Sequence, residues 1–129
     1  MAKVERFEDL KVWQLSRELC KLIHQLTLRD NFCKDFKLVS QIKSASGSVM
    51  DNIAEGYERD GNKEFVQFLS ISKGSCGEVR SQLYRALDND YISNDEFNKA
   101  YSQAIEISKM LSGFMAYLKE SELKGKKYK

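Results

Sequence analysis

The sequence predicts an all-α chain that folds as an antiparallel, up-and-down four-helix bundle. Four stretches repeat apolar residues at spacings of three and four, which is the helical period, and no competing strand pattern is present. The 129 residues include no proline and only 7 glycines, so few positions can interrupt a helix. A chain of this length favours one domain with a single core. We expect that domain to span residues 1–121, followed by a basic tail over residues 122–129.

The first two helices are expected over about residues 8–27 and 38–57, with a loop that can hold a short helical turn between them. The stripe of the first helix, widened by Trp13 and Cys20, consists of Val12, Leu15, Leu19, Leu22, Ile23 and Leu26. The apolar arc of the second helix consists of Leu38, Ile42, Ala45, Val49 and Ile53. Gly56 is expected to close the second helix, because glycine tolerates the positive φ that is common at helix C-termini.

The third and fourth helices are expected over about residues 62–88 and 93–120. The seam of the third consists of Phe65, Phe68, Leu69, Ser72, Cys76, Val79, Leu83 and Leu87. Its start, from Gly61 to Glu64, resembles a capping box with glycine in place of serine or threonine. Ser93 and Glu96 form a complete capping-box signature before the fourth helix. Its apolar stripe consists of Phe97, Tyr101, Ala104, Ser108, Leu111, Met115 and Leu118.

Polar stripes run beside the apolar ones on the second and third helices. At about 100° per residue, the first stripe gathers Gln41, Ser44, Ser48, Asn52 and Glu55. The second gathers Ile71, Ser75, Glu78 and Gln82. Short polar residues let helix axes approach closely, and amides and carboxylates can hydrogen-bond across the contact. We expect both stripes to be at least partly buried, against each other or against another subunit. Full exposure of Asn52 and Glu78 to solvent would contradict this expectation.

The competing interpretation of these residues is a catalytic or phosphate-binding site. Glu55 and Glu78 could form a carboxylate pair, but the sequence supplies no base, nucleophile or glycine-rich substrate loop to accompany them. Gly74, Ser75 and Gly77 suggest a phosphate loop, yet their spacing is not that of a P-loop and the surrounding pattern is helical. Glycine inside a helix costs about 1 kcal/mol relative to alanine, so we expect close helix approach there. The chain is therefore interpreted as a non-enzyme.

Other function classes have little support in the composition. The three cysteines (Cys20, Cys33 and Cys76) are scattered, which is typical of reduced thiols in a cytoplasmic protein. His24 is the only histidine and no Cys-x-x-Cys pair is present, so neither a metal nor another cofactor is expected. No apolar run reaches the roughly 18–20 residues of a membrane span, and the N-terminus lacks the apolar region of a signal peptide.

Positive charge is concentrated at the C-terminus. The tail contains Lys124, Lys126, Lys127 and Lys129. Residues 1–123 therefore have 17 of the 21 basic residues against all 19 acidic ones. Such a tail is either a solvated, disordered segment or an arm that contacts phosphates in a salt-sensitive way. Both interpretations stay open at this point.

The sequence resembles the four-helix-bundle family of 23S rRNA intervening-sequence proteins, which is related to the accessory variability determinant protein of diversity-generating retroelements. The likeness runs from Phe7 to about Leu118. It rests on FEDLKVWQLSREL, on the segment from Gln41 to Leu83, and on the Tyr91-Ile92 turn. Its most specific positions are Gln41, Ile42, Asn52 to Gly56, Arg59, Glu64, Phe65, Gly74, Ser75 and Glu78.

This resemblance implies an up-and-down four-helix bundle that assembles into a ring-like homopentamer. The retroelement relative binds nucleic acid and a reverse transcriptase through basic surfaces, whereas most members have no established activity. No catalytic residues are carried over. The sequence departs from the family pattern at Lys43-Ser44, where a second basic residue is usual, at Gly61, where serine is usual, and at Met50-Asp51, where proline is frequent.

The leading functional hypothesis is a homo-oligomeric accessory protein that associates with RNA or DNA. A patch repeated around a ring acts multivalently, which strengthens weak contacts. Candidate contacts are Lys34, Lys37, Lys43, Arg59 and the four tail lysines. The alternative is a scaffold that recruits another protein and touches no nucleic acid, for which an exposed apolar patch would be the distinguishing feature.

Overall fold

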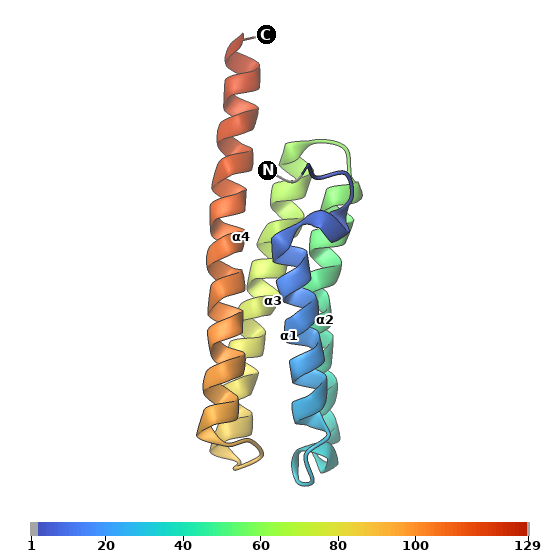
Figure 1. The fold of residues 1–129 in the computed structure, drawn as a ribbon, viewed down its shortest axis with the longest axis vertical. Helices are drawn as coiled ribbons and strands as arrows, with labels where there is room; N and C mark the ends of the chain where they lie inside the picture. The colour runs from blue at the N-terminus through green and yellow to red at the C-terminus, as the bar shows by residue number, and fades with distance from the viewer. Residues whose placement is uncertain (1–2, 129) are drawn as a thin grey trace.

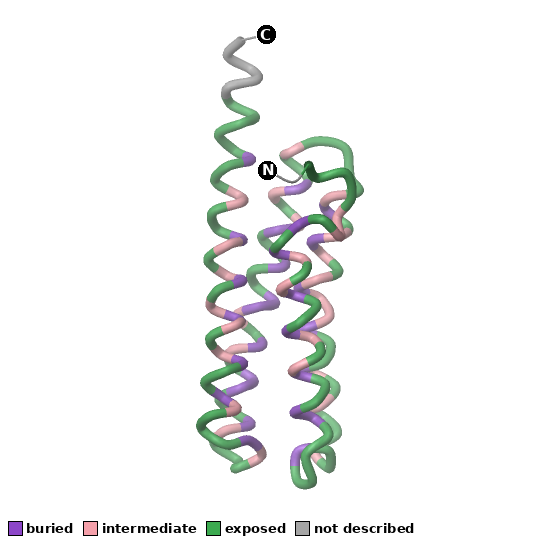
Figure 2. The backbone as a smooth tube through the Cα atoms, in the orientation of Figure 1, coloured by how far each residue is buried: buried purple, intermediate pink, exposed green. Residues whose placement is uncertain are grey.

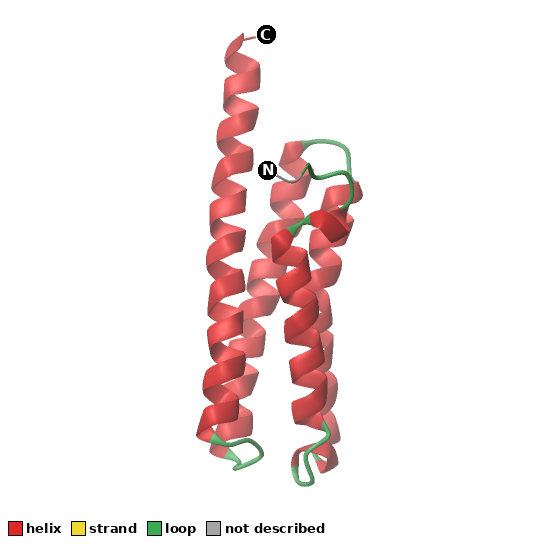
Figure 3. Cartoon of the chain, viewed as in Figure 1, coloured by secondary structure: helices red, strands yellow, loops and turns green. Residues whose placement is uncertain are grey.

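Four long α-helices run alternately up and down in the computed structural model, which describes the backbone of residues 3–128 and the side chains of residues 3–123 (Figure 1). They are α1 (Lys11–Thr27), α2 (Phe36–Glu58), α3 (Asn62–Asp88) and α4 (Asn94–Tyr128). Two short 3₁₀ helices, η1 (Phe7–Asp9) and η2 (Phe32–Lys34), precede α1 and α2. Figure 3 shows short loops between the helices, with no strand in the described residues. The predicted all-α, up-and-down four-helix bundle is confirmed.

The core lies along the axis of the bundle, where the apolar stripes of all four helices meet (Figure 2). Leu19, Ile23, Leu38, Ile42, Val49, Ile53, Leu69, Val79, Leu83, Ile107 and Leu111 are fully buried. Small buried residues bring the helices close together. The Ser72 Oγ on α3 donates to the Val49 carbonyl on α2 at 2.6 Å, and the Cys76 Sγ donates to the Ala104 carbonyl on α4 at 3.1 Å. These contacts fix α3 between α2 and α4.

The start of α2 is held to the loop between α3 and α4. The Asp35 carboxylate caps α2 by accepting the Leu38 backbone N–H at 3.0 Å, and it also accepts the Tyr91 hydroxyl at 2.9 Å. Phe32, in η2, is fully buried and stacks on the Tyr91 ring with centroids 5.3 Å apart. The predicted short helical turn between the first two helices therefore anchors one end of the bundle.

The start of α4 carries the predicted capping box. The Ser93 Oγ accepts the Glu96 N–H at 3.1 Å, and a Glu96 carboxylate oxygen accepts the Ser93 N–H at 2.8 Å. The other Glu96 carboxylate oxygen pairs with the Arg29 guanidinium after α1, which ties α1 to α4. Two orphan N–H groups of the helix are satisfied in this way.

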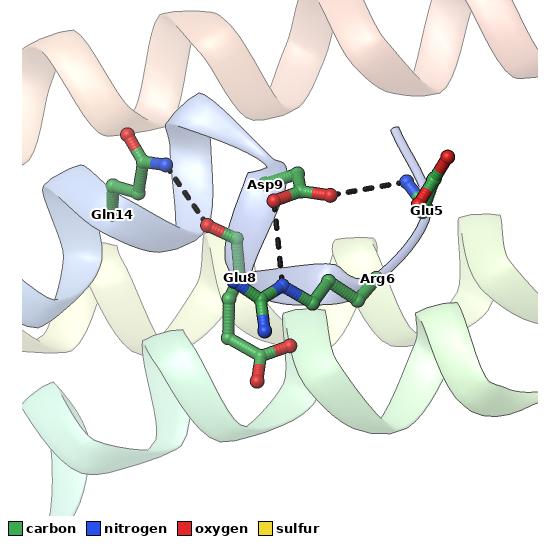
Figure 4. Close-up of polar contacts among 5 residues, drawn as sticks. All are labelled: Glu5, Arg6, Glu8, Asp9 and Gln14. Atoms are coloured by element: carbon green, nitrogen blue, oxygen red, sulfur yellow. Dashed lines mark hydrogen bonds and ion pairs between the residues drawn. The ribbon is translucent and has the colours of Figure 1, made fainter. Parts of the chain in front are cut away.

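The N-terminal segment folds into a polar turn before α1 (Figure 4). The Asp9 carboxylate accepts the Glu5 N–H at 3.1 Å and lies 3.5 Å from the Arg6 Nε, while the Gln14 amide donates to the Glu8 carbonyl at 2.9 Å. We expected the first helix to begin near Glu8. It begins at Lys11 instead, because the bonds of Asp9 hold residues 7–9 in a separate 3₁₀ turn.

The last helix is longer than expected. The prediction ended it near Glu120, but α4 continues to Tyr128 and rises past the ends of the other helices (Figure 1). The segment beyond Glu120 contains no proline, and its serine, glutamate, leucine and lysines are compatible with a helix. Within the described part of the chain, no helix combines the length and the apolar composition needed to cross a membrane.

Candidate functional site

The two predicted polar stripes meet along one side of the bundle and line a groove between α2 and α3. This groove has a volume of about 360 Å³, and its walls consist of Ser40, Gln41, Ser44, Ala45, Ser48, Ser75, Glu78 and Gln82. The Ser48 and Ser75 hydroxyls join the two helices at 2.8 Å. The Asn52 amide donates to the Ser48 hydroxyl and to the Ser48 carbonyl, both at 2.8 Å. The stripes therefore face each other within one subunit, as one of the two predicted alternatives had it.

The burial of the stripes is uneven. Ser75 and Gln82 are buried and Asn52 is half-buried, whereas Glu55 and Glu78 are exposed. The expectation holds for Asn52 but is wrong for Glu78, because Glu78 lies at the mouth of the groove and Ser75, one turn earlier, makes the contact with α2.

Glu55 and Glu78 do not form a carboxylate pair. Ser48 and Ser75 mark where α2 and α3 are level with each other. From that level the two glutamates lie in opposite directions along the bundle, seven and three residues away. At 1.5 Å per residue the glutamates are roughly 15 Å apart along the axis, which is beyond the separation of carboxylates in a hydrolytic pair.

Gly56 closes no helix, which corrects the prediction. The helix continues to Glu58, and its C-cap residue Arg59 has extended backbone dihedrals. Gly56 is buried instead at the contact of α2 with α3, where an added Cβ would lie 2.7 Å from the Phe68 Cβ and 2.8 Å from the Phe65 ring. The motif from Asn52 to Gly56 thus places two architectural residues on the α3 side of α2, since Asn52 bonds to Ser48 and Gly56 admits the Phe65 ring.

Positions around the turn after α2 have further structural roles. Arg59 lies 3.6 Å from the Glu55 carboxylate, and its guanidinium lies 5.2 Å from the centroid of the Phe68 ring. Gly61 has a φ of 105°, so the turn requires glycine there, and α3 starts without a side-chain cap. Glu64 lies exposed in the first turn of α3, where the positive end of the helix dipole stabilises its carboxylate.

The glycines of α3 have no close neighbour, contrary to the prediction. An added Cβ at Gly74 or at Gly77 would meet nothing within 4 Å, so neither glycine allows close helix approach within the subunit. Both lie on the side of α3 away from its buried residues, where Gly74 is exposed and Gly77 is half-buried. Packing within one chain gives no reason for them.

The candidate nucleic-acid contacts are spread over the molecule. Lys34, Lys37 and Lys43 are exposed around the start of α2 and form no ion pair with any described residue. Arg59 lies 22 residues along α2 from Lys37, or roughly 33 Å, and is paired with Glu55. The structure does not bring these four residues into one patch. The side chains of Lys124, Lys126 and Lys127, and all of Lys129, lie outside the described residues.

A second surface feature was missed by sequence reasoning. Arg80, Tyr84 and Tyr101, backed by the buried Phe97, form an aromatic–cationic patch on the outer side of α3 and α4. The Arg80 guanidinium lies 5.5 Å from the centroid of the Tyr101 ring, and the Tyr84 ring packs against Phe97 and Tyr101 with centroids 4.9 and 5.7 Å apart. Tyr84 is 48% exposed, and the buried Arg80 Nε has no hydrogen-bond partner in the described residues.

The sequence did carry a signal for this patch. Arg80 and Tyr84 are four residues apart on α3, as are Phe97 and Tyr101 on α4, and such pairs lie on one helix face. The two aromatic residues of α4 were attributed wholly to the core because they continue its apolar stripe. Phe97 is buried as expected, but Tyr101 is only half-buried, and the packing of α3 against α4 places its ring against the exposed Tyr84.

The cysteines and the histidine are the remaining candidates for reactive or metal-binding groups. The three cysteines are free thiols, and burial raises the pKa of the Cys76 thiol to about 11. His24 is exposed on α1. Among the described residues, no cluster of histidine, cysteine, aspartate or glutamate could hold a metal ion.

These features define the class of protein: a four-helix bundle whose surface has a polar groove between α2 and α3 and an aromatic–cationic patch on α3 and α4. The chain belongs to the 23S rRNA-intervening sequence protein family, whose model matches residues 8–113. This membership confirms the resemblance that the Asn52–Gly56 motif and its neighbours predicted.

A solved structure is also similar to the chain. It is the crystal structure of a protein of unknown function from the S23 ribosomal protein family of Bacteroides thetaiotaomicron, with 22% sequence identity and a TM-score of 0.74. The likeness covers 81% of this chain and 97% of that one. At this identity it shows the fold alone. Among curated proteins, none has a matching sequence.

Proposed function

We propose that the protein is a non-enzymatic, homo-oligomeric bundle that associates with RNA or DNA as an accessory factor. The observation that carries the proposal is the aromatic–cationic patch formed by Arg80, Tyr84 and Tyr101, backed by the buried Phe97. The exposed Tyr84 ring, with the half-buried Tyr101 ring beside it, provides a stacking surface for an unpaired base, and the adjacent Arg80 adds cation–π and phosphate contacts. Membership of a family named after an rRNA insertion supports the same class of ligand.

The exposed lysines add the electrostatic part of the proposal. Lys34, Lys37 and Lys43 form no ion pair with any described residue, so their charges are available to phosphates. Arg59 contributes less, because its guanidinium is already engaged by Glu55 and Phe68. Three dispersed lysines bind weakly in one subunit. A ring of subunits, such as the pentamer that the family resemblance implies, would repeat them and raise the affinity through multivalency.

A binding titration against a structured RNA with unpaired loops tests the proposal. Binding should weaken steeply as the salt concentration rises, and light scattering should give an assembly of several subunits. The Tyr84→Ala variant should bind the RNA less tightly by about 1–3 kcal/mol, the range for loss of one stacked base. Tyr117→Ala, which removes a 65% exposed tyrosine in the C-terminal half of α4, is the matched control and should bind as the wild type does.

Two outcomes would overturn the proposal. One is the absence of RNA and DNA binding at low salt by an intact oligomer. The other is an equal loss of affinity in Tyr84→Ala and Tyr117→Ala, since the patch would then have no special role.

Two observations favour a second candidate function, a scaffold that recruits another protein. Gly74 and Gly77 lie on the surface of α3, where small residues permit another helix to approach closely. Tyr117 and Leu123 are 65% and 68% exposed in the C-terminal half of α4. A scaffold would form its oligomer without binding nucleic acid, so the same titration separates the two candidates.

A further inference from the structure

The groove between α2 and α3 contains a buried hydrogen-bond acceptor without a donor, beside an exposed carboxylate. The Gln82 side chain lines the groove and the residue is 9% exposed, yet its Oε1 has no hydrogen-bond partner among the described residues. The Glu78 carboxylate lies one turn earlier on the same face of α3 and forms no ion pair with a described residue. A buried acceptor that lacks a donor is costly, so Gln82 calls for a donor that a single subunit does not supply.

The other serines and amides deeper in the groove are matched within the subunit, while the Ser40 and Ser44 hydroxyls are exposed to solvent. Ser48 and Ser75 bond to each other, and Asn52 donates to Ser48. The Gln41 Oε1 accepts the Arg85 Nη1 at 3.0 Å. None of the residues that line the groove is basic. The remaining demand is therefore for a donor with positive charge, placed between Glu78 and Gln82.

We propose that this groove binds the guanidinium group of an arginine side chain carried by a partner polypeptide. A guanidinium has five N–H donors in a planar fork, so one edge can serve the Glu78 carboxylate while another reaches Gln82 once its terminal amide turns about χ3. A lysine ammonium is a compact point charge that lacks this fork. The groove of about 360 Å³ has room for the group.

The chain itself contains the same interaction at the end of the groove. Gln41 lies across from Gln82, because the Ser48–Ser75 contact sets the two helices level. There Gln41 accepts a guanidinium N–H from Arg85, which is one turn beyond Gln82 on α3. The proposed arginine would occupy the next position along the groove. Glu78 repels phosphates, so this site is separate from the proposed nucleic-acid contacts and does not depend on them.

The test is an NMR titration of the full-length, ¹⁵N-labelled protein with an acetylated, amidated Gly-Arg-Gly peptide. The peptide should give saturable shifts of the backbone amides of Ser44, Ser75 and Glu78 and of the Gln82 side-chain amide. The same peptide with citrulline in place of arginine has nearly the same shape and no charge, so it should give no saturable shifts. Free arginine amide distinguishes a small molecule from a polypeptide and should bind more weakly than the peptide.

Matched variants assign the site. Glu78→Gln should weaken binding of the arginine peptide at least about tenfold, the effect of losing a charge-assisted hydrogen bond. Glu106→Gln removes another exposed carboxylate, on α4, and should bind as the wild type does. Gln82→Met keeps the side-chain volume but removes the acceptor, and should weaken binding as well. Both glutamates are exposed, so their variants should fold normally.

The proposal is overturned if citrulline and arginine peptides bind alike, or if Glu78→Gln and Glu106→Gln lose the same affinity. Tighter binding of free arginine amide than of the peptide would overturn the assignment to a polypeptide. Absence of any saturable shift, together with an unchanged assembly mass for Glu78→Gln in light scattering, would also overturn it. Loss of assembly mass in Glu78→Gln alone would support it, with a second copy of the chain as the partner.

Discussion

Gly56 on α2 and Phe68 on α3 approach so closely that a Cβ on Gly56 would lie 2.7 Å from the Cβ of Phe68. The same Cβ would lie 2.8 Å from the Phe65 ring, which packs edge-on against Phe114 of α4 with centroids 5.1 Å apart. A glycine in the family motif therefore determines where α3, and through it α4, lies against α2. Its role is architectural.

Substitution of Gly56 by alanine should destabilise the protein. Alanine favours a helix over glycine by about 1 kcal/mol, but the methyl group would force Phe65 and the α3 backbone to shift. Overpacking of this kind costs about 1–3 kcal/mol in excess of that gain. Urea unfolding followed by circular dichroism measures the change. An unchanged or higher free energy of unfolding would show that expansion of the α2–α3 contact costs no more than the helix preference of alanine contributes.

Substitution of Gly74 by alanine should have the opposite sign and is the matched control. Nothing lies within 4 Å of the added Cβ, so only the helix preference of alanine acts. We expect the free energy of unfolding to rise by up to about 1 kcal/mol. The same urea experiment applies, at a protein concentration where the assembly mass of both forms is known. A destabilisation would reveal that another subunit contacts this surface.

Stability should fall in acid as two helix caps become protonated. The Leu38 N–H donates to the Asp35 carboxylate and holds its pKa below the usual value of 3.8. The Ser93 N–H donates to the Glu96 carboxylate and holds its pKa below the usual value of 4.5. A depressed native pKa contributes stability that is present above the unfolded pKa and is lost as pH falls through the native one. The free energy of unfolding should therefore be nearly level above pH 4.5 and decline below it.

Glu96→Gln isolates one share of this acid dependence. The variant should lose stability near neutral pH, because it removes the ionised cap and its pair with Arg29, and its unfolding free energy should decline less below pH 4.5. Glu106→Gln, on the exposed side of α4, should leave the pH profile as it is. Identical slopes in the two variants would mean that the Ser93–Glu96 capping box makes no pH-dependent contribution.

The three thiols should differ in reactivity. Burial raises the pKa of Cys76 to about 11 and also raises the pKa of Cys20, whereas Cys33 is exposed. Only the thiolate is nucleophilic, so iodoacetamide at pH 8 should modify Cys33 first and Cys76 only after unfolding. Mass spectrometry of the labelled protein over time measures the order. Labelling of Cys76 at the rate of Cys33 would contradict the close packing of α3 against α4.

The elements that the sequence predicted correctly are those governed by local rules. The helical period of the apolar residues defined four helices, and Ser93 with Glu96 defined the start of the last one, because capping depends on residues three positions apart. The end of α2 was predicted to within one residue, but the role of Gly56 was wrong, since glycine fits both a helix terminus and a close contact. Only the position of Phe65 and Phe68 distinguishes the two.

The candidate sites were predicted in part, for the same reason. Helical phase placed Ser48, Asn52 and Ser75 on facing stripes, and their hydrogen bonds confirm it. The aromatic–cationic patch was missed because Tyr84 and Tyr101 lie on different helices, and their contact depends on how α3 and α4 are set against each other. Likewise, the missing donor of Gln82 becomes visible only when every neighbouring group has been placed.

By itself the sequence determined the fold class, the family and the faces of each helix, because periodicity and motif spacing are properties of a single chain segment. Only the tertiary structure decided which side chains from different helices meet: Gly56 with Phe68, Ser48 with Ser75, Arg80 with Tyr101. Such contacts depend on the rotation and axial position of whole helices, which many weak packing interactions set together and no local pattern encodes.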